Sequence, residues 1–389
     1  MAAVRSLISS LRLTPGAAVP LKSSASSLIR DESSFVNLNL NLSASCASAK
    51  ASRRVAPPSA AATPLAAAAA APTAEDASSV AASVAASGTE GTPRRRLKVG
   101  CHAAQGRRDE MEDHVVVLED IGAGFLYAGV FDGHAGASSA KFLSDELHDD
   151  CMEALEGGAV LEDEDLTAAE DALEDAFLKA DQRLLQWLEE HSSEPESGST
   201  GTVAFVRHDR LFVAHIGDSR AVMAVGGDEG YVSDDHKPSG DSGKAQAEIK
   251  RINKAGGWVS QGRVCGVIAV SRAFGNMAFK TRKEEMMQQG VKKGRWTTRW
   301  VSKRKYDSDW ISALPDVYGT ELTEDAEFVI IASDGLWDAF SSSEAVAFVR
   351  GEMDRHGDVQ QACEALVHAA LHDRETEDNT SVIVISLRG

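Results

Sequence analysis

Four aspartates stand where apolar stretches of the chain begin or end. Each could present a carboxylate at the end of a buried strand, and they are Asp132, Asp218, Asp334 and Asp378. Clustered carboxylates repel one another and hold raised pKa values unless cations neutralise them. Their hard oxygen ligands favour Mg²⁺ or Mn²⁺ over Zn²⁺. Alone, the motif around Asp132 also fits an ordinary Asp-Gly turn, but the four together predict a metal site.

The residues next to these aspartates extend the chemistry. The carbonyl of Gly133 can approach a cation closely, and His134 can hold or release a proton near neutral pH. Arg108 offers a planar fork for phosphate oxygens, while Glu112 and Asp113 could hold metal-bound waters. The alternative for this last group is a salt-bridged loop. A two-metal site can activate a bridging water and bind a transferred phosphoryl group. His134 could then protonate the leaving alcohol.

The order of strands and helices predicts an α+β fold with a central β-sandwich of two antiparallel sheets. Helical spacing over residues 138–155 and 166–188 indicates one pair of helices, and a capping box at Ser341 begins another helix. These pairs should flank the sandwich in α-β-β-α layers. Residues 211–217 and 221–226 are expected to pair as a hairpin, and residues 267–271 as a further strand.

Charge disfavours one class of function. The net charge is −19, and residues 101–389 hold 29 basic against 54 acidic residues, a net −25. Such a body repels nucleic acid, which disfavours a metal-dependent nuclease. The basic run from Lys280 to Lys305 breaks the pattern with ten Lys or Arg and two Glu. It is either a solvated face or a docking surface for an acidic partner.

The first hundred residues differ in composition from the rest. Ser and Ala dominate, and up to Ala74 the only acidic residues are Asp31 and Glu32. This composition is typical of a chloroplast transit peptide, placed at residues 1–60, followed by an Ala/Ser-rich linker at residues 61–96. A twin-arginine export signal at Arg53-Arg54 is the weaker alternative, because its apolar core is mostly alanine. No run is apolar enough to span a membrane, and no tail anchor precedes Gly389.

Residues 97–389 resemble the metal-dependent type 2C protein phosphatases. The similarity rests on eight short motifs spread over the whole body: Arg108–Asp113, Val130–Gly136, Gly198–Thr202, Gly217–Ala221, Asp235–Pro238, Ala269–Gly275, Ser333–Asp338 and Glu377–Thr380. The resemblance implies hydrolysis of phosphoserine or phosphothreonine in proteins, with two Mg²⁺ or Mn²⁺ ions in a cleft at one end of the sheets. It also implies a flap beside that cleft, at residues 276–310.

The family's site residues can be carried over position by position. The resemblance implies that Asp132 bridges two metals, that Gly133 ligates one through its carbonyl, and that Asp334 and Asp378 complete the other. It further implies water-mediated contacts for Glu112 and Asp113, phosphate binding by Arg108, acid catalysis by His134 and a weaker third metal at Asp218 and Asp338. The family usually has Asp where this chain has Asn276, which concerns the local loop geometry.

A closer similarity is to the thylakoid-associated phosphatases of plants and algae. It rests on residues 249–258, the basic run around residues 290–296, and residues 333–348. It implies a phosphorylated light-harvesting antenna protein as substrate, control of state transitions, and a place in the stroma or on the stromal face of the thylakoid. Docking would use Lys292, Lys293, Arg295, Trp296 and Arg299. We expect a monomer with peripheral membrane contact. The alternative is a catalytically weak phosphoprotein-binding module on the same fold.

Overall fold

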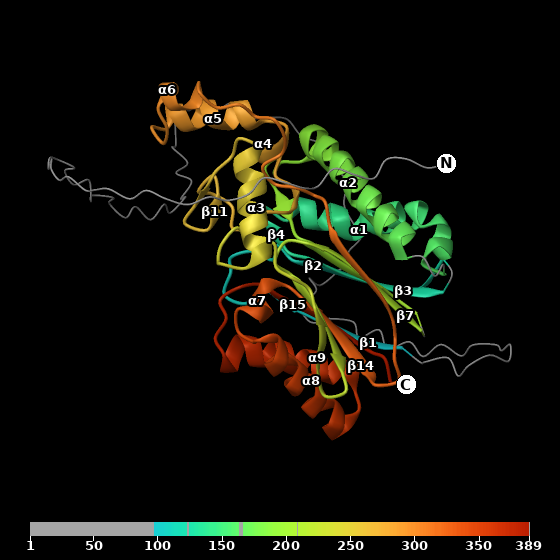
Figure 1. The fold of residues 1–389 in the computed structure, drawn as a ribbon. Coiled ribbons are helices and arrows are strands. Elements are labelled where there is room, and N and C mark those ends of the chain that lie inside the picture. The colour runs from blue at the N-terminus through green and yellow to red at the C-terminus, as the bar shows by residue number, and fades with distance from the viewer. Residues whose placement is uncertain (1–96, 123, 163–165, 208, 389) are drawn as a thin grey trace, which may run out of the picture. The chain divides into compact units, whose positions relative to one another are not determined.

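The structure is a computed structural model that describes residues 97–122, 124–162, 166–207 and 209–388. The expected transit peptide at residues 1–60 and the linker at residues 61–96 lie outside the described residues. Within the described part, two five-stranded antiparallel sheets form the centre of the fold (Figure 1).

Neighbouring strands within each sheet are far apart in sequence. The first sheet has the order β1 (Lys98–Ala104), β15 (Thr380–Ser386), β14 (Ala326–Ala332), β8 (Arg220–Val225) and β9 (Asp228–Val232). The second has the order β13 (Asp316–Glu321), β7 (Arg210–Ile216), β6 (Gly201–Val206), β3 (Phe125–Phe131) and β2 (His114–Ile121). Both sheets therefore combine strands from the two ends or the middle of the body, and long-range pairing holds it together.

The layers follow from the alternation of side chains along buried strands. On β3, Phe125, Tyr127 and Phe131 point to the helices of one face, in a core with α1 (Ser138–Ala154) and α2 (Leu166–His191). The residues between them, Leu126, Ala128 and Val130, pack against the first sheet. Helices on the other side cover the outer face of the first sheet: α8 (Ser342–His356) and α9 (Val359–His368). The expected α-β-β-α sandwich is thus confirmed.

The expected hairpin of residues 211–217 and 221–226 is wrong. β7 pairs with β6 and β13 in the second sheet, whereas β8 pairs with β14 and β9 in the first. The turn that carries Asp218 therefore crosses from one sheet to the other. A local turn signal cannot distinguish a hairpin from such a crossing, because strand partners are decided by long-range packing. The crossing is what brings Asp218 to the open end of the sandwich.

The flap, defined as residues 276–310, folds into three short helices: α4 (Met277–Lys280), α5 (Lys283–Lys292) and α6 (Thr298–Val301). It packs on a core of its own that includes Trp310, Phe279 and Met287. Residues 267–271, expected as a strand, form a loop with one isolated bridge from Ile268 to Val264. Ile268 and Val270 of this loop pack into the flap core.

The remaining elements are short. They are η1 (Glu156–Glu162), the π turn η2 (Ala369–Asp373), α3 (Gly243–Lys254), α7 (Asp334–Trp337), the hairpin of β10 (Val259–Ser260) with β11 (Arg263–Val264), and a small sheet of β4 (Gly133–His134), β5 (Gly198–Ser199) and β12 (Phe274–Gly275). The capping box at Ser341 is present at the start of α8. Over the described residues, no helix combines the length and apolarity that a membrane span requires.

Candidate active site

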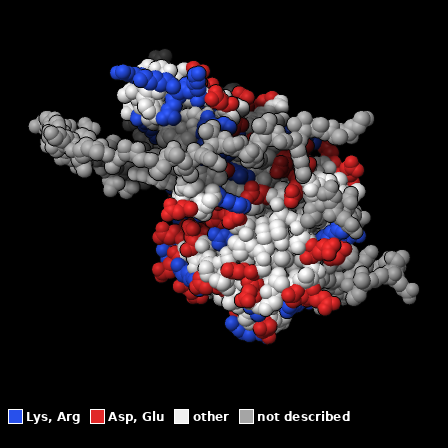
Figure 2. Space-filling model, in the orientation of Figure 1, with Lys and Arg blue, Asp and Glu red and all other residues white. Residues whose placement is uncertain are grey.

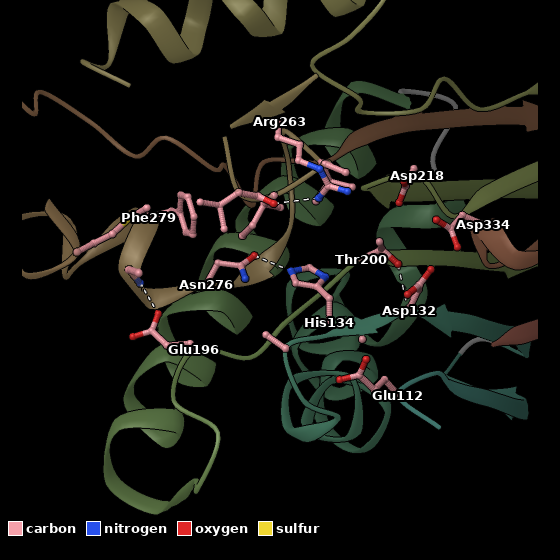
Figure 3. Close-up of a pocket in the computed structure, with 18 of the residues that line it drawn as sticks. Glu112, Asp132, His134, Glu196, Thr200, Asp218, Arg263, Asn276, Phe279 and Asp334 are labelled. Carbon is pink, nitrogen blue, oxygen red and sulfur yellow. Dashed lines mark hydrogen bonds between the residues drawn. The ribbon is translucent and has the colours of Figure 1, made fainter. Parts of the chain in front are cut away.

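A cavity of about 550 Å³ opens where one end of the sandwich meets the flap. One of its walls is acidic and comes from both sheets, through Asp132, Asp218, Asp334 and Asp378. The opposite wall comes from the flap and the loop before it, including Phe279, Arg282, Met286 and Arg295. Figure 3 shows Asp132, Asp218 and Asp334 on one side of the cavity, and His134 between them and the flap residues Asn276 and Phe279.

The four aspartates reach the cavity from four different strands. Asp132 follows β3, Asp218 follows β7, Asp334 follows β14, and Asp378 stands just before β15. The carboxylates of Asp132, Asp218 and Asp334 each place an oxygen within 4.8 Å of the others. Three carboxylates at this spacing suit a hard divalent cation. The structure thus brings three of the four carboxylates together, and Asp378 lines the same cavity.

Burial and mutual repulsion raise the pKa values of these carboxyls. Burial, followed by the charges of Asp218 and Asp378, raises the pKa of Asp334 to about 8. Burial is also the main reason that the pKa of Asp132 lies well above its ordinary value, with Asp113 and Asp334 adding to it. Ionising all of these carboxyl groups without a bound cation therefore costs free energy, because their negative charges would repel one another in one site. The donor set fits a divalent metal.

A loop ahead of β2 brings two more acidic residues to the cavity region. Asp113 is buried, and its Oδ2 has no hydrogen-bond partner among the described residues. Burial raises its pKa to about 6, although the nearby hydroxyls of Ser333 and Ser381 lower it. An unsatisfied buried carboxylate oxygen needs a water or cation partner. Asp113 is therefore suited to the water-mediated role that the resemblance implies.

Glu112 is fixed at both its backbone and its side chain. Its backbone N–H donates to Oδ1 of Asn379 at 2.8 Å, and its Oε1 accepts from the N–H of Gly136 at 2.5 Å. The amide of Asn379 also donates to the carbonyls of Gln105 and Glu110. Asn379 thus holds the loop that carries Glu112 through three hydrogen bonds. Asn379 is part of the motif at residues 377–380, but the sequence did not predict this role.

Arg108 lies at the mouth of the cavity. Its Nη2 donates to Oδ2 of Asp378 at 2.5 Å, and its side chain is 55% exposed. The guanidinium therefore keeps other N–H groups for a ligand, which fits phosphate binding. Asp378 belongs to the same wall as Asp334, but its Oδ2 is engaged in the ion pair with Arg108. Asp338 is exposed beside them, and its charge contributes to the raised pKa of Asp334.

Thr200 and Gly133 fix the position of Asp132. The backbone N–H of Asp132 donates to Oγ1 of Thr200 at 3.1 Å, and Thr200 N–H donates back to the Asp132 carbonyl at 2.9 Å. At Gly133, a Cβ would lie 2.4 Å from the carbonyl oxygen of Glu112. Glycine is thus required there by close backbone packing, in addition to the carbonyl access expected from the sequence.

A lysine supplies the cation nearest to Asp218. The Nζ of Lys237 lies 3.3 Å from Oδ2 of Asp218 and 3.8 Å from Oδ2 of Asp235. Burial lowers the pKa of Lys237, but these carboxylates outweigh it and the pKa is raised. Lys237 therefore stays charged and offsets part of the negative charge at the position that the resemblance gives to a third metal.

His134 stands on the small sheet at the edge of the acidic wall. Its Nε2 lies 3.0 Å from Oδ1 of Asn276 at the start of the flap. Burial lowers the pKa of His134, and the bond to Asn276 together with the charge of Asp218 opposes this. The sequence related Asn276 only to loop geometry, whereas the structure brings it into direct contact with the proposed acid. The 142 residues between them hide this contact from local patterns.

The expected docking residues lie on the flap but differ in exposure. Lys292, Lys293, Arg295 and Arg299 are exposed, whereas Trp296 is partly buried. The ring of Trp296 packs edge to face on Trp258 at 5.3 Å and stacks near Trp300 at 6.0 Å. Trp296 therefore stabilises the flap itself. Figure 2 shows Lys and Arg gathered on the flap, above a body with many acidic side chains.

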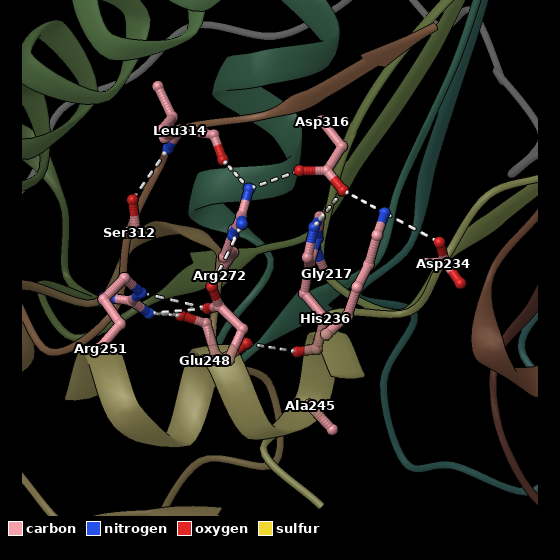
Figure 4. Close-up of polar contacts among 12 residues, drawn as sticks. Gly217, Asp234, His236, Ala245, Glu248, Arg251, Arg272, Ser312, Leu314 and Asp316 are labelled. Atoms are coloured by element: carbon pink, nitrogen blue, oxygen red, sulfur yellow. Dashed lines mark hydrogen bonds and ion pairs between the residues drawn. The ribbon is translucent and has the colours of Figure 1, made fainter. Parts of the chain in front are cut away.

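A second group near the sheets has ligand-like residues but a different chemistry. His215, His236 and Asp316 lie close enough to share a metal. Figure 4 shows His236 and Asp316 among their polar contacts. However, Nδ1 of His236 accepts from the N–H of Gly217, so its proton must lie on Nε2, which faces Asp316 at 3.5 Å. Nε2 of His215 faces the carbonyl of Asp234, which leaves a lone pair on its buried Nδ1 that is unpartnered among the described residues. Because His236 carries its hydrogen toward Asp316 and Asp316 is also paired with Lys244, we describe the group as an ion-pair network.

The same network positions α3 and the loop before the flap. Arg272 donates to Asp316 at 2.8 Å and to Glu248 on α3 at 3.1 Å, and Arg251 donates to Glu248 and to the Ser271 carbonyl. The nearby His236, Lys244 and Arg272 hold the pKa of Asp316 well below its ordinary range. These charge-assisted bonds fix the segment that leads from the sandwich into the flap.

Comparisons with known proteins show the family of this chain. A model of the protein phosphatase 2C family matches residues 97–380. The chain is 47% identical over 309 residues to protein phosphatase 2C 57 of Arabidopsis thaliana, covering 79% of each chain. It is 33% identical over 279 residues to a probable protein phosphatase 2C of Caenorhabditis elegans, covering 70% of this chain and 68% of the relative.

The fold also matches solved structures. A phosphatase from Toxoplasma gondii aligns with a TM-score of 0.58 at 21% identity, over 76% of this chain and 94% of that chain. This likeness supports the fold, while the family match and the sequence identities establish the relationship. The chain belongs to the protein phosphatase 2C family and is a protein serine/threonine phosphatase.

Proposed function

We propose that this chain hydrolyses phosphoserine and phosphothreonine in proteins with Mg²⁺ or Mn²⁺ held by Asp132, Gly133, Asp334 and Asp378. The observation that carries the proposal is the convergence of carboxylates with raised pKa values beside Arg108 and His134. When bound, two such cations would supply an activated water and positive charge for the phosphoryl oxygens.

The protein groups would divide the remaining work. Arg108 would bind phosphate oxygens with the N–H groups that Asp378 leaves free, and so orient the phosphorus. His134 would give its proton to the departing serine or threonine oxygen. Glu112 and Asp113 would hold ordered waters, and Asp218 with Asp338 would take a weaker third cation in competition with Lys237.

We also propose a phosphorylated light-harvesting antenna protein as the substrate and the chloroplast stroma or the stromal thylakoid face as the location. The motif resemblance and the composition of residues 1–60 support this. The exposed flap cations Lys292, Lys293, Arg295 and Arg299 would offset the negative charge of the body for an anionic partner. Reporter import into plastids by residues 1–60 is the test of location. A reporter that stays outside plastids would contradict it.

The chemical part is tested by phosphate release from two matched peptides, one with phosphothreonine and one with phosphotyrosine. We expect release from the phosphothreonine peptide in Mn²⁺, little release from the other, and none in EDTA. Release that persists in EDTA would contradict the metal dependence. Antenna specificity is tested by comparing a phosphorylated antenna protein with an unrelated phosphoprotein of equal charge, and equal rates would contradict it.

A further inference from the structure

We propose that Asn276 is a positioning residue for His134, fixing the hydrogen on Nε2 so that Nδ1 carries the proton used on the leaving group. The inference rests on the proposed function, because it assigns a role within the same reaction. The sequence treats Asn276 as a departure from the family pattern, where Asp is usual. The structure gives that position a specific contact, 3.0 Å from the Nε2 of His134.

The small sheet places the two residues on opposite sides of one glycine. In it, His134 on β4 pairs with Gly198 on β5, and Gly198 pairs with Gly275 on β12, directly before Asn276. A Cβ on Gly198 would lie 2.2 Å from Nδ2 and 2.5 Å from Oδ1 of Asn276. The absent side chain thus makes the space through which the amide reaches the imidazole.

Asn276 is held rigidly at its own backbone. It is 1% exposed and adopts a left-handed conformation, with φ of 57° and ψ of 53°, which Asn tolerates better than most residues. Its N–H donates to the Ser197 carbonyl at 3.0 Å, and its carbonyl accepts from Phe279 N–H at 2.9 Å. These two hydrogen bonds hold the Asn276 backbone in place. The fixed backbone directs the side-chain amide toward His134.

The flap base behind Asn276 is fixed by a buried ion pair. Asp181 on α2 accepts from the N–H of Gly275 at 2.8 Å and from Nζ of Lys280 at 2.6 Å. Lys280 also donates to the Ala273 carbonyl at 2.9 Å. These bonds anchor the residues before and after Asn276 to α2, so the contact with His134 is supported from the rest of the fold.

The chemistry follows from hydrogen-bond polarity. An amide oxygen can only accept, so Nε2 of His134 must carry a hydrogen and donate it. In the neutral ring this leaves Nδ1 without a hydrogen, so the acid is the imidazolium, whose transferable proton is the one on Nδ1. When the alcohol oxygen leaves phosphorus, it takes that proton, and the electron pair of the N–H bond stays on Nδ1. The ring ends neutral with its hydrogen still on Nε2.

The test compares two leaving groups. An alkoxide needs a proton far more than a nitrophenolate, so loss of acid positioning should slow a phosphothreonine peptide selectively. With Mn²⁺, we expect Asn276→Ala to reduce kcat on the peptide by about tenfold or more and kcat on p-nitrophenyl phosphate by less than about threefold, within the range of acid catalysis. Asn276→Asp keeps an acceptor oxygen and should restore the peptide rate. Exposed Asn253→Ala on α3 is the matched control and should change neither.

Further variants separate positioning from folding. Gly198→Ala keeps Asn276 but displaces its amide, and should show the same selective loss. In a double-variant cycle, Asn276→Ala should add no further peptide loss to His134→Gln, because both remove one function. Equal losses on the two substrates, or additive losses in the cycle, would overturn the inference.

A readout without turnover uses the metal-free protein. The ¹⁵N chemical shifts of the His134 ring, assigned by comparison with His134→Gln, should report hydrogen on Nε2 in the wild type and a mixture of tautomers in Asn276→Ala. An unchanged tautomer would overturn the inference even if the enzyme is active. A wild type that releases no phosphate with Mn²⁺, but shows the expected ring shifts, would overturn the proposed function and leave the contact intact.

Discussion

The ammonium of Lys280 at the flap base lies 2.6 Å from Oδ2 of Asp181 on α2, and both residues are more than nine-tenths buried. The pair connects the flap to the helical layer of the second sheet. Burial raises the pKa of Asp181, and Lys280 opposes this with charge and hydrogen bonds. A buried ion pair, shielded from water, therefore anchors the base of the flap to α2.

Removing one partner of this pair should destabilise the fold strongly. Lys280→Met leaves the Asp181 carboxylate buried and unpaired, so we expect the free energy of unfolding to fall by about 3–5 kcal/mol. The control is Lys141→Met, which breaks an exposed pair with Asp145 and should cost less than about 1 kcal/mol. Urea unfolding in EDTA measures both. Equal costs for the two variants would contradict the buried-pair account.

Stability of the metal-free protein should fall as pH rises. In the folded state the pKa of Asp113 is raised to about 6 and that of Asp334 to about 8, from an ordinary 3.8. The folded protein therefore keeps protons that the unfolded chain has lost, and the free energy of unfolding decreases from about pH 4 to about pH 8. Each group contributes at most about 1.4 kcal/mol per pH unit within its window.

Two variants show which carboxyl groups cause this pH dependence of the free energy of unfolding. Asp334→Asn should make the decrease shallower between about pH 6 and pH 8, because it removes the group whose pKa lies at about 8. Exposed Asp354→Asn on α8 is the control and should leave the slope unchanged. A metal-free protein whose stability is constant or rises between pH 5 and pH 8 would show that the carboxylates do not repel as the structure indicates.

Charge on the flap should affect encounter with a protein substrate rather than chemistry. Reversing Lys292, Lys293 and Arg299 to Glu should raise KM on a phosphorylated antenna protein, and the effect should shrink at high salt. Activity on p-nitrophenyl phosphate should remain nearly unchanged. The matched control reverses Lys250 and Lys254, which are exposed on α3. Equal losses on both substrates would mean that these residues support the fold or the metal site.

The residues that the sequence could place at the cavity are those marked by local patterns. Asp132 and Asp334 follow long apolar strands, and a carboxylate at such a strand end needs no distant partner to be noticed. The capping box at Ser341 was readable for the same reason. The sandwich itself followed from strand and helix order, because two-faced strands need layers on both sides.

The features that the sequence missed depend on long-range contacts. The partners of β7 and β8, the bond from Asn276 to His134 and the pair of Asp181 with Lys280 each join residues far apart in the chain. The burial of Trp296 follows from a flap core built by Trp258 and Trp300, which a basic run does not reveal. Packing decided these points, and periodicity carries no information about them.

The central claim is that the acidic wall holds the catalytic cation, and calorimetric titration of metal-free protein with Mn²⁺ tests it most directly. Phosphate release from a phosphothreonine peptide is measured on the same samples. We expect Asp334→Asn to lose most Mn²⁺ affinity and all metal-dependent release while remaining folded, and exposed Asp338→Asn to keep both to a much larger extent. Wild-type Mn²⁺ affinity and release in Asp334→Asn would contradict the claim.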